Sequence, residues 1–362
     1  MLHAEHAAGF ESHLLCYHDG LGPTDVAVTV HRVGRTMGTA TPGARAFRSG
    51  PSARKLLLDA ALVSGVRRLA RELCADVTIA HHVEAAAACG LAAVPFTYCA
   101  HTSVEAELPT YFPGFPRPLF AGVGYALDAL SLRAARSNLA VSPLLADMLA
   151  RAHGQRVHRL PLPWPLPERR WSEVAAEARQ TLGLPEAAHV VLYAGNLDGY
   201  QGLRPMLAGM SMAASACESL RLVIATASRR DEVECLLRAF PGLRGRVLHV
   251  PLAGEPVRRR LHAAASVVLV PRSAPGGLPI KLLDALSRGC AVVAAQTASA
   301  GFDLAQICRL VPDACAASWS HAVRAAPVGD EALRRAWIAD NFSAKRYTTA
   351  LCTSAHRVRS RG

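Results

Sequence analysis

The segment PGGLPIKLLDALSRG (275–289) brings two glycines, one lysine and one aspartate together at the start of a predicted helix. Gly276 and Gly277 allow a backbone to come close to a ligand, and the first amides of a helix favour a negatively charged group. Lys281 and Asp284 follow within the helix. The segment therefore predicts a phosphate-binding site. The alternative is a tight turn in which Lys281 and Asp284 form a surface ion pair three residues apart.

The helix of this segment is predicted to lie between Pro279 and Gly289. Proline suits the first helical turn, and glycine suits the position just beyond the end. The lysine and the aspartate are expected on a different face from the apolar residues. Three apolar residues at helical spacing are predicted to face the core: Ile280, Leu283 and Leu286.

A second glycine-bearing loop, GNLDGYQGL (195–203), follows the apolar run HVVLYA and opens another predicted helix. Arg272 directly follows the apolar run SVVLVP in the same way. In open parallel sheets, ligands bind outside the carboxyl ends of the strands, where the loop and Arg272 would lie. Both are therefore candidate ligand contacts.

The second half of the chain alternates short apolar runs with segments of helical periodicity. Runs that are apolar throughout are typical of parallel strands covered on both faces by helices, so this half is predicted to be a doubly wound α/β domain. The predicted strands are 189–194, 221–226, 246–251, 266–271 and 291–295, and the predicted helices are about 204–218, 230–240, 255–264 and 279–288.

The first half repeats this rhythm less fully. Its predicted strands are 13–17, 26–31, 76–80, 95–100 and 137–142, with a long helix across 53–73. The segment RVHRLPLPWPLPERR (156–170) has too many prolines for a helix and is predicted to be a semi-rigid linker. We expect two Rossmann-like domains facing each other across a cleft. The expected ranges are 1–160 for the first domain, 161–345 for the second and 346–362 for a C-terminal helix or tail.

Composition limits the partners. Lys and Arg total 40 against 28 Asp and Glu, so the net charge of +12 favours an anionic partner, although a GC-rich genome would give the same arginine bias. The basic, turn-rich segment 31–55 contains only one aromatic residue, Phe47, and this scarcity disfavours binding of single-stranded nucleic acid. An anionic membrane surface is therefore the favoured partner of the basic residues. The ten cysteines show no C-x-x-C pair, and no signal peptide or membrane-spanning run is present, so a cytoplasmic protein at the inner membrane face is expected.

The two loops and several further segments together resemble retaining glycosyltransferases of family 4, which have the two-Rossmann-domain GT-B architecture. LLDALSRGCAVVAA resembles the family's acidic helix and following strand, with Asp284 as the acidic residue. In the first half, ADVTIAHHVEAA, the stretch VPFTYCAHTSVEAELPTYFP with His101, and SNLAVSPLLADML with Ser142 resemble successive strands of the family. The resemblance covers most of residues 10–345.

The resemblance implies roles for particular residues in binding a nucleoside-diphosphate sugar. His101 would contact the transferred sugar as the catalytic residue, and Asp284 would accept hydrogen bonds from the ribose. The backbone amides near Gly276 and Gly277 would contact the diphosphate or the sugar. Gly195, which has no side chain, would leave room for the donor at its loop. No metal or other cofactor is expected.

Three positions depart from the family's pattern. Gly276 stands where the family has its first acidic residue, and Asn196 and Gln201 stand where it has the loop Arg and Lys that neutralise the diphosphate. Arg272 and Lys281 are the nearest substitutes for those cations. The family's first strand, with its glycine-rich turn, also has no counterpart in this sequence. The resemblance implies a hexosyltransferase acting on an unidentified acceptor, with a lipid and a polysaccharide as candidates. The departures leave as the alternative a catalytically impaired GT-B relative that binds nucleotide or pairs with a partner protein.

Other functions and sites are less favoured. A GT-B phosphorylase would need a much longer chain, and an epimerase would need cleft carboxylates that the sequence does not place. His81, His82 and Glu84 contain metal-ligating groups. However, adjacent residues of a strand point to opposite faces, so His81 and His82 are not expected to share a metal ion.

Overall fold

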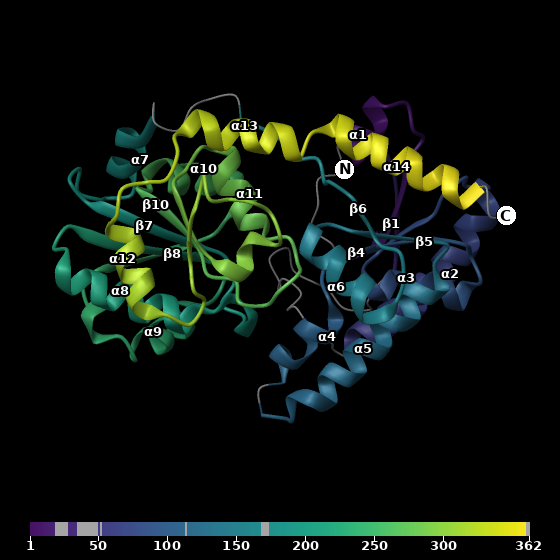
Figure 1. The fold of residues 1–362 in the computed structure, drawn as a ribbon, viewed down its shortest axis with the longest axis horizontal. Helices are drawn as coiled ribbons and strands as arrows, with labels where there is room; N and C mark the ends of the chain where they lie inside the picture. Colours follow the sequence, from purple (N-terminus) through teal and green to yellow (C-terminus); the bar gives the residue numbers. More distant parts are fainter. Residues whose placement is uncertain (19–27, 35–49, 51–52, 113, 168–173, 360–362) are drawn as a thin grey trace. The chain divides into compact units, whose positions relative to one another are not determined.

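The computed structural model describes residues 1–18, 28–34, 50, 53–112, 114–167 and 174–359 (Figure 1). The chain divides into two compact units. Unit 1 contains Met1–Pro163 together with Phe342–Gly362, and unit 2 contains Trp164–Asn341. The C-terminal helix therefore belongs to the first unit, and each unit has its own parallel sheet.

Unit 2 is built around a six-stranded sheet with the order β12-β11-β10-β7-β8-β9, in which every described neighbouring pair is parallel. The central strands are apolar along almost their whole length and are buried. This confirms the doubly wound sheet that the uniformly apolar runs predicted. The strands are β7 (His189–Ala194), β8 (Leu220–Thr226), β9 (Val247–Pro251), β10 (Val267–Val270), β11 (Val292–Ala295) and β12 (Arg309–Val311).

Helices cover both faces of this sheet (Figure 1). One layer contains α7 (Ala175–Thr181), α10 (Gly254–Ala264), α11 (Ile280–Ser287) and α13 (Glu331–Asn341), and the other contains α8 (Leu203–Ala216), α9 (Arg230–Leu237) and α12 (Ala316–Arg324). Because β7 and β10 are parallel neighbours, the loops after them leave the same edge of the sheet. These are the loops that carry the candidate residues of this unit.

The parallel strands of unit 1 form two sheets in the part of the chain that the structure describes. One pairs β1 (His13–Tyr17) with β2 (Thr29–Val33), and the other has the order β3-β4-β5-β6. The second contains β3 (Ile79–His81), β4 (Thr97–Ala100), β5 (Ser137–Ala140) and β6 (His158–Arg159). The predicted strand at 26–31 is shifted toward the C-terminus, since β2 begins at Thr29 and residues 26 and 27 lie outside the described residues. The suggestion that a family strand is missing stays a prediction.

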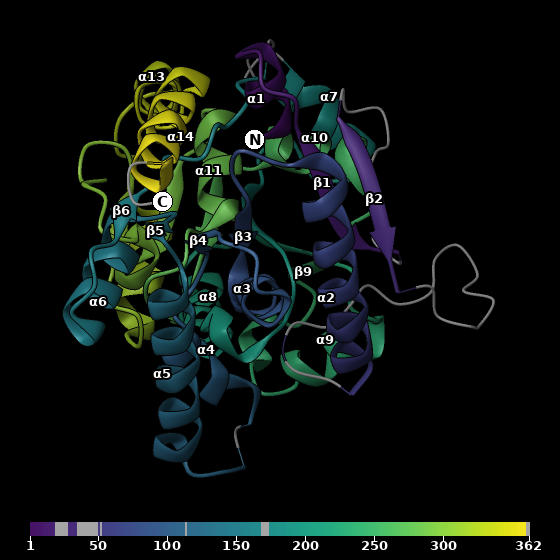
Figure 2. The same cartoon turned by 90° about the vertical axis from the view of Figure 1, so that its right-hand side faces the viewer.

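Helices of unit 1 lie on both sides of its strands (Figure 2). On one side, α3 (His82–Ala92) packs against α2 (Ala53–Leu73) and α5 (Arg117–Ala134), while α4 (Val104–Glu107) packs on α5. On the other side, α14 (Ala344–Arg359) contacts β5 and α1 (Leu2–Ala7). The Tyr347 hydroxyl donates to the Glu5 carboxylate, which joins the two ends of the chain. The remaining helix, α6, spans Pro143–His153.

Helix α11 keeps its predicted ends but not its predicted inward face. The helix ends in a Schellman motif. The Gly289 amide donates to the Leu286 carbonyl at 2.9 Å, and the Cys290 amide donates to the Ala285 carbonyl at 2.9 Å. Gly289 has φ +74°, so a residue without a Cβ suits this position. Ile280, which was predicted to face the core, is 61% exposed. It is the first helical residue, and the buried face is formed by Leu282, Leu283, Ala285 and Leu286.

Candidate functional site

The loop after β7 is held by its own polar side chains. The Asn196 amide nitrogen Nδ2 donates to the Asp198 carboxylate at 2.5 Å and to the Tyr200 hydroxyl oxygen at 2.9 Å. The Gln201 amide nitrogen Nε2 donates to Asn196 Oδ1 at 2.7 Å, and Gln201 is buried. The two amides that stand at the expected Arg and Lys positions therefore fix the shape of the loop and bring no positive charge to it.

Lys281 supplies a cation to the same loop from α11. Its Nζ donates to the Tyr193 hydroxyl oxygen at 3.1 Å and lies 4.9 Å from the centre of the Tyr193 ring. A Cβ at Gly195 would lie 2.0 Å from Lys281 Cε, so only glycine leaves room for the lysine to pass. Lys281 is one of three lysines in a chain that otherwise uses arginine. The side chain is therefore positioned by packing and does not form a surface pair with Asp284.

The surroundings of Lys281 shift the pKa of its side chain toward neutral pH. Burial and, after it, the positive charge of Arg272 lower the pKa of its ammonium to about 7, against the opposing effect of the Asp198 carboxylate. The charged and neutral forms are therefore nearly balanced at neutral pH. A diphosphate bound beside this amine would favour the charged form and raise its pKa.

Arg272 lies just after β10, on the same edge of the sheet as the loop after β7. Its guanidinium carbon lies 5.1 Å from the centre of the Tyr200 ring, and its Nε donates to the Ala274 carbonyl at 3.1 Å. A Cβ at Gly202 would lie 2.3 Å from the Pro271 carbonyl oxygen, so the two loops are in close contact. Unit 2 therefore brings three parts together at one edge of its sheet. They are the loop after β7, Arg272 from the loop after β10, and Lys281 from α11.

The glycines before α11 are both buried. Gly276 has φ +89°, a conformation that residues with a Cβ rarely adopt. A glutamate at this position would therefore be strained. The glycine is consequently part of the loop's conformation, and restoring the family's acidic residue here would change the backbone.

Asp284 belongs to a separate ion-pair network beneath the loop. Its Oδ1 accepts from Arg288 Nε at 2.8 Å, and its Oδ2 lies 3.7 Å from His262 Nε2 and 3.8 Å from Arg258 Nε. Arg288 also donates to the Glu255 carboxylate at 2.7 Å. The carboxylate is thus neutralised by Arg258 of α10 and by Arg288, which directly follows α11. It still has lone pairs for a further donor, because each carboxylate oxygen can accept more than one hydrogen bond.

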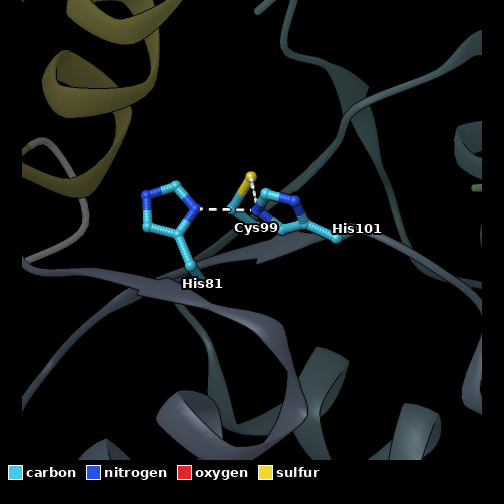
Figure 3. Close-up of side chains that lie close together, drawn as sticks. All are labelled: His81, Cys99 and His101. Atoms are coloured by element: carbon cyan, nitrogen blue, oxygen red, sulfur yellow. Dashed lines mark hydrogen bonds between the residues drawn. The ribbon is translucent and has the colours of Figure 1, made fainter. Parts of the chain in front are cut away.

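In unit 1, His101 follows β4 and contacts His81 of the neighbouring strand. The His81 Nδ1 and His101 Nε2 atoms are 2.9 Å apart and share one hydrogen bond, while Cys99 Sγ lies 3.9 Å from His101 Nε2 (Figure 3). Burial and the nearby histidines lower the pKa of His101 to about 3, so its imidazole is neutral at physiological pH. His82 instead begins α3, and its Nδ1 pairs with Glu84 at 2.8 Å. The two adjacent histidines therefore have different partners.

Several residues of these sites had no part in the sequence analysis. Tyr193 and Asp198, which contact or face the lysine, lie within an apparently ordinary strand and loop. Arg288 and His262 hold Asp284 and become visible only once α10 packs beside α11. Cys99 joins the histidines, and its spacing of two residues from His101 at the end of the predicted strand 95–100 was a signal for this contact.

Comparison with protein families assigns both halves of the chain. The family "Glycosyltransferase Family 4" matches residues 2–163, and "Glycosyl transferases group 1" matches residues 188–326. The two halves of the chain therefore resemble the family 4 and group 1 glycosyltransferases, as the motifs had indicated. No curated protein sequence matches it.

Solved structures with the same fold are distant in sequence. Sucrose-phosphate synthase from Thermosynechococcus elongatus is 15% identical with a TM-score of 0.77, covering 100% of this chain and 92% of its own. Anabaena HepE in complex with UDP and glucose is 15% identical with a TM-score of 0.64, covering 90% and 86%. WaaG, a glycosyltransferase involved in lipopolysaccharide biosynthesis, is 18% identical with a TM-score of 0.63, covering 97% and 91%. These likenesses establish the two-domain Rossmann-like GT-B fold.

A membrane-spanning helix was not expected, and among the described residues no helix is both long and apolar enough to cross a bilayer. All ten cysteines are free thiols. Three of them, Cys89, Cys99 and Cys308, are buried.

Proposed function

We propose that the protein transfers a hexose from a UDP-sugar to an acceptor hydroxyl, with retention of the anomeric configuration. The observation that carries the proposal is the position of Lys281, whose ammonium lies on the loop after β7. That loop is where the resemblance expects the cations that neutralise the diphosphate. The complexes of HepE with UDP and with UDP-glucose support uridine as the base.

The proposed chemistry is the departure of a nucleoside diphosphate. The bond between the anomeric carbon and the phosphate oxygen breaks, and negative charge develops on that oxygen, where Lys281 and Arg272 stabilise it. The acceptor oxygen forms the new bond on the same face, and its proton passes to the departing phosphate. Asp284 accepts hydrogen bonds from the ribose, and neutral His101 contacts the transferred sugar. We assign no protein nucleophile.

A thermal-shift panel of UDP, GDP and ADP and their glucose derivatives tests the donor site. A nucleotide at 100 times its dissociation constant is expected to stabilise the protein by about 2.7 kcal/mol. We expect this shift with the uridine compounds, its loss in Lys281→Met, and its retention in Lys345→Met, which removes an exposed lysine. A turnover assay with the stabilising donor then follows. A cooperatively melting protein that no nucleotide stabilises would contradict the transferase proposal and favour the impaired relative.

The same proposal places the protein at an anionic membrane surface, with a lipid or polysaccharide acceptor. Most of the basic segment 31–55 lies outside the described residues. Helix α5 supports the proposal independently, because apolar residues dominate its exposed face and arginines flank them. Arg117 and Arg133 lie near its two ends, and Asp128, its single acidic residue, is buried. The exposed apolar residues are Leu119, Val123, Tyr125, Leu127 and Leu130, and Phe115 precedes them.

Cosedimentation with phospholipid vesicles tests this face of α5. Leu119→Glu combined with Val123→Glu is expected to weaken binding to vesicles rich in phosphatidylglycerol at least tenfold, since buried apolar side chains contribute about 1.5–3 kcal/mol each. Leu333→Glu, at an exposed leucine of unit 2, is the matched control. Unchanged binding of the double variant would contradict the membrane contact. A second outcome would also contradict it. If the wild type and the control are dimers and the double variant is a monomer, a second chain covers this face.

A further inference from the structure

Three metal-ligating side chains of unit 1 lie on one face of its sheet. Cys99 lies in β4 and His101 is the first residue after this strand, with its Nε2 3.9 Å from Cys99 Sγ. His81 lies directly opposite Cys99 in the parallel pairing of β3 with β4. Figure 3 shows the two imidazoles and the thiol turned toward one another. Their three ligand atoms all lie within 4.8 Å of one another.

The spacing of these atoms is close to that of a tetrahedral zinc site. Zn–N bonds of about 2.0–2.1 Å and a Zn–S bond of about 2.3 Å place two nitrogens about 3.4 Å apart and nitrogen and sulfur about 3.6 Å apart. The structure has 2.9 Å between His81 Nδ1 and His101 Nε2, and 3.9 Å between Cys99 Sγ and His101 Nε2. These two separations need to change by about half an ångström each. The third, between His81 Nδ1 and Cys99 Sγ, is within 4.8 Å, and rotation of the side chains would close it.

We propose that His81, Cys99 and His101 bind one soft divalent cation, such as Zn²⁺, as a three-ligand site with an open fourth position. The neutral imidazoles bind through His81 Nδ1 and His101 Nε2, with their protons on the opposite ring nitrogens. The Cys99 thiol loses its proton as the metal–sulfur bond forms, so one proton is released for each metal ion. Two nitrogens and one sulfur favour zinc over magnesium or calcium, which prefer oxygen.

The site gives zinc an inhibitory role, and this step rests on the proposed function. There, His101 contacts the transferred sugar, and a metal ion on its Nε2 would occupy the nitrogen that faces His81 and Cys99. The loaded protein would therefore hold His101 in a fixed orientation with a cation beside it. We expect the fixed ring and the added positive charge beside it to slow donor transfer while zinc is bound.

Titration with Co²⁺ as a spectroscopic probe tests the metal site without an activity assay. We expect one Co²⁺ per chain, a near-ultraviolet thiolate-to-cobalt band, tetrahedral visible bands, and loss of all of them when Zn²⁺ is added. Cys99→Ala should abolish the thiolate band and weaken binding at least tenfold, and His81→Gln should weaken it similarly. Cys89→Ala, at another buried cysteine of unit 1, should retain the wild-type spectrum. A thiolate band that persists in Cys99→Ala, or no tetrahedral spectrum in the wild type, overturns the site.

The inhibitory role is tested by transfer assays with and without added Zn²⁺. The wild type is expected to lose activity as zinc is added, while Cys99→Ala should require at least tenfold more zinc for the same loss. A cobalt spectrum that depends on Cys99, together with zinc-insensitive transfer, would support the metal site and contradict the proposed contact of His101 with the sugar. Equal zinc sensitivity in Cys99→Ala would contradict inhibition through this site.

Discussion

Lys281→Met is expected to lower kcat/KM for the UDP-sugar by about 10²–10³-fold, with the folded structure retained. The lysine is a half-buried cation beside the loop after β7, and the amides of Asn196 and Gln201 cannot replace its charge. Removal of one preorganised group that stabilises developing negative charge typically has an effect of this size. Methionine fills a similar volume beside Tyr193. Lys345→Met, at an exposed lysine, should leave the rate unchanged.

Gly195→Ala tests the same arrangement without removing the amine. Its Cβ would lie 2.0 Å from Lys281 Cε, so the lysine must leave its place beside Tyr193. We expect a fall in kcat/KM comparable to that of Lys281→Met. Changes of less than threefold in both variants, measured on correctly folded protein, would show that the diphosphate is neutralised elsewhere.

The pH dependence of donor binding gives an independent test of the lysine. In the unliganded protein its pKa is about 7, below its ordinary value, and the bound diphosphate raises it. The complex therefore binds more protons than the free protein above about pH 7. Donor affinity should accordingly fall as the pH rises through this range, by up to tenfold per pH unit. In Lys281→Arg, whose guanidinium stays charged, the affinity should be independent of pH there, and a flat wild-type profile would contradict the role of the lysine.

The same shift affects folding in a defined direction. An unfolded lysine binds its proton up to a higher pH than Lys281 does in the folded protein, so the unfolded state binds more protons between the two pKa values. The contribution of this residue to the free energy of unfolding therefore rises with pH above about 7. As the pH rises over this range, nucleotide affinity should fall while the contribution of Lys281 to the free energy of unfolding rises. Weaker binding at higher pH would therefore not be explained by unfolding at this residue.

The sequence predicted the strands of unit 2 well because their physical signal is local. Runs such as those of β8 and β10 are apolar at every position, as burial on both faces of a parallel sheet requires. Helix α5 carries no such signal. Its segment RPLFAGVGYALDALSLRA has small and apolar residues on all sides, so the pattern does not separate a buried face from an exposed one.

The candidate sites were only partly predictable, because contacts between elements decide how their side chains are used. Spacing along α11 suggested an ion pair between Lys281 and Asp284. Tyr193 draws the lysine to one side, and Arg288, four residues along the helix, draws the aspartate to the other. In unit 1, strand geometry predicted opposite faces for His81 and His82, but His82 lies outside β3, begins α3 and stacks on the His101 ring. The pairing of β3 with β4, which brings Cys99 beside His81, could not be derived from either strand alone.

Asp284→Ala is expected to destabilise the protein by about 3 kcal/mol, before any effect on the donor. Arg288 is 6% exposed, and it would lose the carboxylate that accepts from its Nε at 2.8 Å. Breaking a buried ion pair by removing one partner typically costs about 3–5 kcal/mol, because an uncompensated charge remains. Glu255 still accepts from Arg288, which favours the lower end of that range. For a domain of the size of unit 2, we expect the melting temperature to fall by roughly 6–12 °C.

The contrast with a double variant isolates the buried charge as the cause. Asp284→Leu combined with Arg288→Met removes both charges and should recover most of the lost stability, since apolar replacements of a buried pair are often neutral. Asp231→Ala, at the exposed pair with Arg229, should leave the melting temperature unchanged. A melting temperature of Asp284→Ala within 2 °C of the wild type would contradict the network.

This instability changes how the ribose contact of Asp284 has to be measured. Loss of a nucleotide-induced shift in Asp284→Ala could come from Arg288, which has lost one of its two carboxylates, moving α11 and, with it, Lys281. Asp284→Asn keeps one oxygen as an acceptor for Arg288 and removes only the charge, so it separates the two causes. If Asp284 binds the ribose, Asp284→Asn should bind a nucleotide less tightly than the wild type at a temperature where both are folded, while inorganic diphosphate, which has no ribose, should bind to both equally. Equal weakening for both ligands would assign the effect to the displaced lysine.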